Sequence, residues 1–194
     1  MKDEQLYDHY KETNELCRNA QKQRDRYFFL MCVAIFILLM LSAYPSESIL
    51  MISDGLKEAV GVTPTVGLHV IQSFGWMLYL WITLRYYQRS IYVERTYKYI
   101  ESLEEKLGIT REGTAYEEDY PAILNMIHGV YQLFFPIVTL LSTVVKIIWE
   151  YSNQRSIAFY CLDTVVAILI IVTTILYWLC IHPLPKLRKK KKKG

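Results

Sequence analysis

Two charged residues, Lys146 and Asp163, lie inside long apolar stretches of the sequence. Either charge at the middle of a bilayer costs about 2.5–3.5 kcal/mol, so such a charge needs a partner or access to water. Lys146 precedes Asn153 by seven residues and Asp163 follows it by ten. We expect both at comparable depth, towards the outer leaflet, as an intramembrane ion pair or as the lining of a pore. In the alternative interpretation, Lys146 snorkels to the outer surface and Asp163 lies in the interface.

Recognised catalytic motifs are missing from the sequence. There is no phosphate-cradling glycine loop, no H-E-x-x-H and no nucleophile elbow. The four cysteines show no metal-ligand spacing, and the histidines are far apart in the chain, at His9, His69, His128 and His182. We therefore expect a protein that is not an enzyme and that uses neither a metal nor a cofactor.

Four apolar runs must position the two charges: residues 27–44, 66–84, 129–149 and 156–181. Hydrocarbon about 30 Å thick takes about 20 helical residues at 1.5 Å each. Lipid cannot satisfy unpaired backbone groups, so these runs are expected to be helices. A soluble bundle would need four helices that are apolar on every face. The sequence therefore predicts an all-α polytopic membrane protein, with transmembrane helices 1 and 2 in 27–84 and helices 3 and 4 in 129–181.

Lysine and arginine alternate between the connections. Residues 1–26 hold six of them, 45–65 one, 85–128 six, 150–155 one and 182–194 seven. Positive residues concentrate on the cytoplasmic side of membrane proteins. The pattern predicts a multi-pass protein of the cell inner membrane with both termini in the cytoplasm.

The two long basic segments each carry an apolar stripe at helical spacing. One lies in a cytoplasmic N-terminal helix, residues 1–26, and the other in a cytoplasmic extension and connector, residues 85–128, with Gly108 as its helix cap. The stripes consist of Leu6, Tyr10, Thr13, Cys17 and Ala20, and of Val93, Tyr97, Ile100, Leu103 and Leu107. We expect them to form a coiled-coil stalk or to bind an oligomer partner. Alternatively, each lies on the membrane surface or on another part of the chain.

Two further segments are expected to touch the membrane. The connection 45–65 has helically spaced apolar residues and predicts a periplasmic amphipathic helix. The polybasic tail 182–194 is expected to bind anionic lipids, through Lys186, Arg188, Lys189, Lys190, Lys191, Lys192 and Lys193. Direct nucleic-acid binding is not predicted, because no aromatic residues interleave with these charges and no folded module accompanies them.

Three stretches resemble a family of small bacterial four-span membrane proteins to which no chemistry is assigned. They are the segments 91–100, 111–116 with Tyr120 and Pro121, and 6–13. More loosely, the plan is similar to membrane subunits of anti-phage defence systems, such as the Kiwa membrane subunit and the SLATT-type effectors. The SLATT likeness is architectural, because that type has two spans. The resemblance implies a cytoplasmic helical extension that binds a soluble sensor or effector.

Two functions follow as hypotheses. In the first, the chain is a non-enzymatic membrane subunit that forms a homo-oligomer and couples a cytosolic protein partner to the membrane. Anti-phage defence, by membrane sensing or permeabilisation, is its expected setting. In the second, the chain is a small oligomeric ion channel or transporter, as Lys146 and Asp163 suggest.

Overall fold

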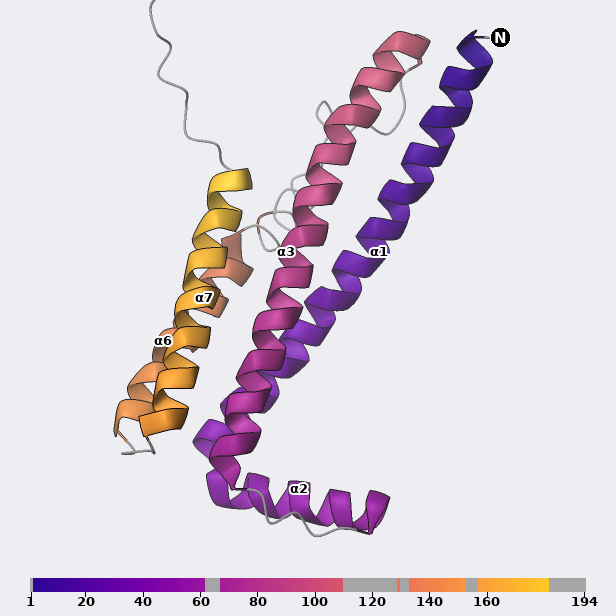
Figure 1. Ribbon diagram of the computed structural model, residues 1–194. Helices are drawn as coiled ribbons and strands as arrows, with labels where there is room; N and C mark the ends of the chain where they lie inside the picture. The colour runs from indigo at the N-terminus through magenta and orange to yellow at the C-terminus, as the bar shows by residue number, and fades with distance from the viewer. Residues whose placement is uncertain (1, 62–66, 110–128, 130–132, 153–156, 182–194) are drawn as a thin grey trace, which may run out of the picture.

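The computed structural model describes residues 2–61, 67–109, 129, 133–152 and 157–181, and these are helical apart from short turns, with no strand among them (Figure 1). The prediction of an all-α protein is therefore confirmed for the described part of the chain. Its elements are α1 (Lys2–Ala43), α2 (Pro45–Val60), α3 (Leu68–Leu107), α6 (Phe135–Ser152) and α7 (Ile157–Ile181).

Helix α1 joins the charged N-terminal segment and the first apolar run into one rod of 42 residues. Neither proline nor glycine interrupts residues 2–43, so nothing in the backbone breaks the helix. It ends at Ala43, because the residue before Pro45 is disfavoured in helical conformation. Pro45 then opens α2, where a missing backbone N–H costs nothing.

Helix α3 likewise joins the second apolar run to the charged extension, in 40 residues. Gly108 ends it in the left-handed region, with φ of 62°, which glycine adopts without strain. The backbone N–H of Gly108 donates to the carbonyl oxygens of Glu104 and Glu105. This is the cap that the sequence predicts.

The helices form two unequal antiparallel pairs (Figure 1). α1 and α3 pack along most of their length, while the shorter α6 and α7 pack on each other and, through α7, against the first half of α3. Figure 1 shows α1 and α3 reaching well past the end of α7. We call residues 4–24 of α1 with residues 91–107 of α3 the two-helix arm. Residues 27–43 of α1 and 68–90 of α3, with α6 and α7, are the four-helix base.

α6 falls within the predicted run 129–149 and just beyond it, and α2 falls within the predicted connection 45–65. α6 runs from Phe135 to Ser152, and Gly129, Leu133 and Phe134 ahead of it are also helical. α2 is a helix, as predicted for the connection 45–65. It runs crosswise to α1 and α3 and extends away from α6 and α7 (Figure 1).

By length and composition, two helices of the described chain, α1 and α7, could each cross a membrane. The apolar part of α6, Phe135–Trp149, is shorter. α3 is not among the candidates, because its first half includes His69, Gln72 and Ser73. These polar residues lower its mean hydropathy, so the four apolar runs of the sequence are not four equivalent helices.

Candidate functional site

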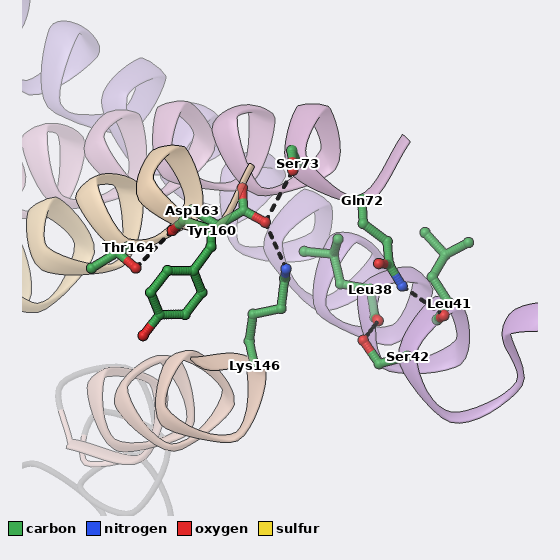
Figure 2. Close-up of polar contacts among 9 residues, drawn as sticks. All are labelled: Leu38, Leu41, Ser42, Gln72, Ser73, Lys146, Tyr160, Asp163 and Thr164. Carbon is green, nitrogen blue, oxygen red and sulfur yellow. Dashed lines mark hydrogen bonds and ion pairs between the residues drawn. The ribbon is translucent and has the colours of Figure 1, made fainter. Parts of the chain in front are cut away.

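Lys146 and Asp163 meet between α6 and α7, as Figure 2 shows. Lys146 Nζ lies 2.8 Å from Asp163 Oδ2. The lysine side chain is 4% exposed and the aspartate side chain 2%. A buried pair needs close geometry and further hydrogen bonds to offset the desolvation of two charges. The structure thus brings together the two charges that the apolar runs place in different helices.

A third helix completes this site. Ser73 Oγ of α3 donates to Asp163 Oδ2 over 3.0 Å, so one carboxylate oxygen receives both contacts. Asp163 Oδ1 is buried and has no hydrogen-bond partner among the described residues. Ser73 itself is 2% exposed. The carboxylate therefore ties α7 to both α3 and α6, and we call Ser73, Lys146 and Asp163 the three-helix tie.

An apolar pocket of 320 Å³ adjoins the tie. Trp76 lines it, and Lys146 Nζ lies 5.8 Å from the centre of the Trp76 ring. A cation at this distance from an indole face is attracted by the ring quadrupole. The other lining residues come from α1 and α6: Ile35, Leu38, Leu39, Ser42, Ala43, Ser142, Val145, Lys146 and Trp149.

The base holds more buried polar contacts than the sequence reasoning anticipated. Gln72 Nε2 donates to the Leu41 carbonyl oxygen of α1 over 2.8 Å (Figure 2). The Tyr79 hydroxyl lies 2.9 Å from Thr139 Oγ1 of α6. The Tyr87 hydroxyl lies 3.0 Å from Thr174 Oγ1 of α7, and its ring stacks on Tyr177. α3 therefore forms side-chain hydrogen bonds with each of the other three long helices.

The predicted stripes of the two-helix arm face each other. One cluster contains the buried Tyr10, Cys17, Ala20, Val93, Ile100 and Leu103, with the partly buried Leu6, Tyr97 and Leu107 packed against it. These side chains were also expected to bind an oligomer or protein partner. Their burial against each other fits the predicted stalk, and binding to a partner through them stays a prediction.

Polar contacts flank this cluster. The Tyr10 hydroxyl donates to Glu104 Oε1 over 3.1 Å, and Glu104 is fully buried. Gln21 Nε2 donates to the Tyr97 hydroxyl. The sequence analysis missed Glu104, although it stands next to Leu103 and four residues after Ile100. That spacing puts it at the edge of the stripe and was the available signal.

Other predicted sites lie outside the described residues. The polybasic tail, with Lys186, Arg188 and Lys189 to Lys193, is among them. In the part of the chain that the structure describes, no group of three His, Cys, Asp or Glu side chains is placed to hold a metal ion.

Comparisons with known proteins leave the chain without a named relative. No protein-family model, curated protein or solved structure matches it. The resemblance to small bacterial four-span proteins and to anti-phage membrane subunits therefore remains an expectation from the sequence.

Proposed function

We propose that the chain is a non-enzymatic inner-membrane subunit that couples a cytosolic protein partner to the bilayer. In this proposal the four-helix base spans the membrane and the two-helix arm stands in the cytoplasm, with both termini on that side. The base self-associates, and the arm presents its charged surface to the partner.

The observation that carries this proposal is the length of α1 and α3. Helices of 42 and 40 residues extend about 60 Å, twice the thickness of hydrocarbon. α6 and α7, with 18 and 25 residues, are close to what one crossing needs. A pair of helices that continues beyond its membrane neighbours is suited to contact a soluble protein.

The polarity of the base supports membrane spanning by α3 and α6 as well. On α3, Gln72 is fully buried and Ser73 is 2% exposed, whereas Phe74 is 69% exposed. On α6, Thr139 is fully buried and Leu141 is 60% exposed. Polar residues inside and large apolar residues outside are what a lipid solvent favours, and an average hydropathy does not register this arrangement.

Anti-phage defence enters the proposal through the sequence resemblance alone. In such a setting the partner would sense infection, and the base would sense or permeabilise the membrane. The alternative, a small oligomeric channel or transporter, is favoured by the pocket beside Lys146. The charges of Lys146 and Asp163, however, neutralise each other within the three-helix tie. A single chain therefore has little charge in this region to attract an ion.

Membrane placement is tested first by fractionation and reporter fusions. We expect the full chain in the carbonate-resistant membrane fraction, with a reporter after Gly194 active only in the cytoplasm. A reporter inserted after Gly55, in α2, is expected to be active only in the periplasm. Recovery of the untagged chain in the soluble fraction would contradict the proposal.

Coupling is tested by photo-crosslinking in the host cell. A photoreactive amino acid at Leu16, which is 52% exposed on the arm, is expected to capture a cytosolic protein. The same group at Ile168, 53% exposed on α7, is expected to capture only lipid or a second copy of the chain. Ion flux in liposomes from the isolated chain would instead favour the channel, and normal phage replication after deletion would count against a role in defence.

A further inference from the structure

A second pocket, of 420 Å³, lies between α1 and α3 at the junction of the arm and the base. Its lining combines two arginines with aromatic and apolar side chains: Gln23, Arg26, Tyr27, Leu30, Trp81 and Arg89. Arg26 is the last charge before the apolar run of α1, and Arg89 follows the apolar run of α3. The pocket therefore straddles the level at which both helices change from apolar to charged.

The electrostatics of this pocket are unbalanced. Of the side chains that the structure describes, two guanidinium groups line it and no carboxylate does. Arg89 Nε is buried and has no hydrogen-bond partner among the described residues, although a buried donor normally has one. A planar guanidinium pairs well with a phosphate oxygen, so an anion with acceptor oxygens would complete the pocket.

The apolar side of the pocket indicates which anion. Leu30 is 36% exposed and Trp81 48% exposed, and both belong to the base. The Tyr27 ring packs edge-on against Trp81 at 6.2 Å, and the Arg85 guanidinium lies 5.7 Å from the Trp81 ring. Tryptophan and tyrosine beside arginine are typical of the level of lipid headgroups. An acyl chain can follow Leu30 and Trp81 while the phosphate meets the arginines.

We propose that this pocket binds the phosphodiester headgroup of an anionic phospholipid in the inner leaflet. Arg26 and Arg89 receive the phosphate, and Trp81 contacts the upper part of an acyl chain. The proposal rests on the membrane placement proposed above, and the site is separate from the polybasic tail. Bound lipid would fix the junction at which the arm leaves the bilayer.

The test uses the full chain in phosphatidylcholine vesicles with a rising fraction of brominated phosphatidylglycerol, which quenches tryptophan on contact. A matched series carries the bromine on phosphatidylcholine instead. The fluorescence of the parent chain minus that of Trp81→Phe gives the contribution of Trp81, and its quenching is compared between the two series. We expect phosphatidylglycerol to be preferred at Trp81 by about tenfold, the ratio that one charge-assisted contact of ordinary strength provides.

The double variant Arg26→Gln/Arg89→Gln is expected to reduce this preference to about one. Arg95→Gln is the matched control, because Arg95 is exposed on α3 and lies outside this pocket, and it should keep the preference. All variants retain the polybasic tail, so any attraction of phosphatidylglycerol by the tail is the same in each.

Three outcomes would overturn the proposal: an unchanged preference in the double variant, an equal loss in Arg95→Gln, or loss of the preference when excess inorganic phosphate is added. The last would indicate a site for free phosphate. A chain that inserts into vesicles but shows no preference refutes only the lipid site. A chain that never enters the membrane fraction refutes the proposed function first.

Discussion

The two-helix arm and the four-helix base differ in the residues that they bury and expose, although α1 and α3 run through both. In the arm the buried cluster consists mainly of apolar side chains such as Val93 and Ile100, and most charged residues other than Glu104 lie outside. In the base, Gln72, Thr83 and Lys146 are buried, whereas Phe36 and Phe74 are more than 60% exposed. This difference agrees with the proposed placement, in which water surrounds the arm and lipid surrounds the base.

This difference changes what holds each region together. The arm gains from removing apolar surface from water, so its stripe is its main source of stability. The base gains nothing comparable in lipid and relies on close packing and hydrogen bonds between helices. Substitutions of the same type in the two regions should therefore have different effects.

The largest effect is expected from Asp163→Ala. It leaves the Lys146 ammonium buried without its carboxylate, and breaking one partner of a buried pair costs about 3–5 kcal/mol. The free energy of unfolding, measured by detergent titration of the purified chain, should fall by that amount. α6 and α7 should separate from α3 first, because Asp163 also binds Ser73.

The matched control replaces both charges, as Lys146→Met/Asp163→Leu. Because no uncompensated charge remains, this variant should unfold close to the parent. A loss in the double variant equal to the sum of the losses in Lys146→Met and Asp163→Leu would show that the two charges do not interact, contrary to their 2.8 Å separation.

Next in size is Tyr10→Phe in the arm. It removes the hydroxyl that donates to the buried Glu104. Loss of a hydrogen-bond donor to a buried acceptor lowers stability by about 1–3 kcal/mol. Hydrogen exchange should accelerate in residues 4–24 and 91–107 and stay unchanged in α7. Tyr7→Phe, at an exposed position of the same helix, should leave exchange unaltered, and an equal acceleration there would contradict the role of the Tyr10 hydroxyl.

Gly108→Ala should weaken the end of the arm. Gly108 has a positive φ, and a side chain in that conformation costs about 1–2 kcal/mol. Gly55→Ala is the contrast, because Gly55 lies within α2 with open space around its Cα and should gain about 0.5–1 kcal/mol of helix stability. Melting followed by circular dichroism should show a lower melting temperature for Gly108→Ala and a higher one for Gly55→Ala. Changes in the same direction would contradict this explanation.

The smallest effect is expected from Tyr79→Phe in the base. It removes the hydroxyl that meets Thr139 of α6, the same chemical change as Tyr10→Phe. Hydrogen bonds between membrane helices average about 0.6 kcal/mol, because the separated helices find other partners. The loss of unfolding free energy, measured by detergent titration, should thus be smaller than the loss that hydrogen exchange reports for Tyr10→Phe. A loss above that of Tyr10→Phe would mean that the base is not surrounded by lipid.

Several features followed from the sequence because they depend on neighbouring residues. Residues 2–43 contain neither proline nor glycine, which is consistent with one continuous α1, and Gly108 predicted the end of α3. The 3–4 spacing of Tyr10, Cys17 and Ala20 placed them on one face. Helix continuity, helix ends and the facing of side chains are set within a few residues, so the sequence alone specifies them.

Other features required the tertiary structure, because they depend on which helices meet and at what rotation. Spacing put Lys146 and Asp163 at similar depth, but only the packing of α6 on α7 brought their charged atoms to 2.8 Å and added Ser73 from α3. The burial of Glu104 and the pocket between Arg26 and Arg89 likewise depend on the rotation of α1 against α3. Apolar side chains leave that rotation open over a wide range, and the hydrogen bonds and ion pairs between helices select one arrangement.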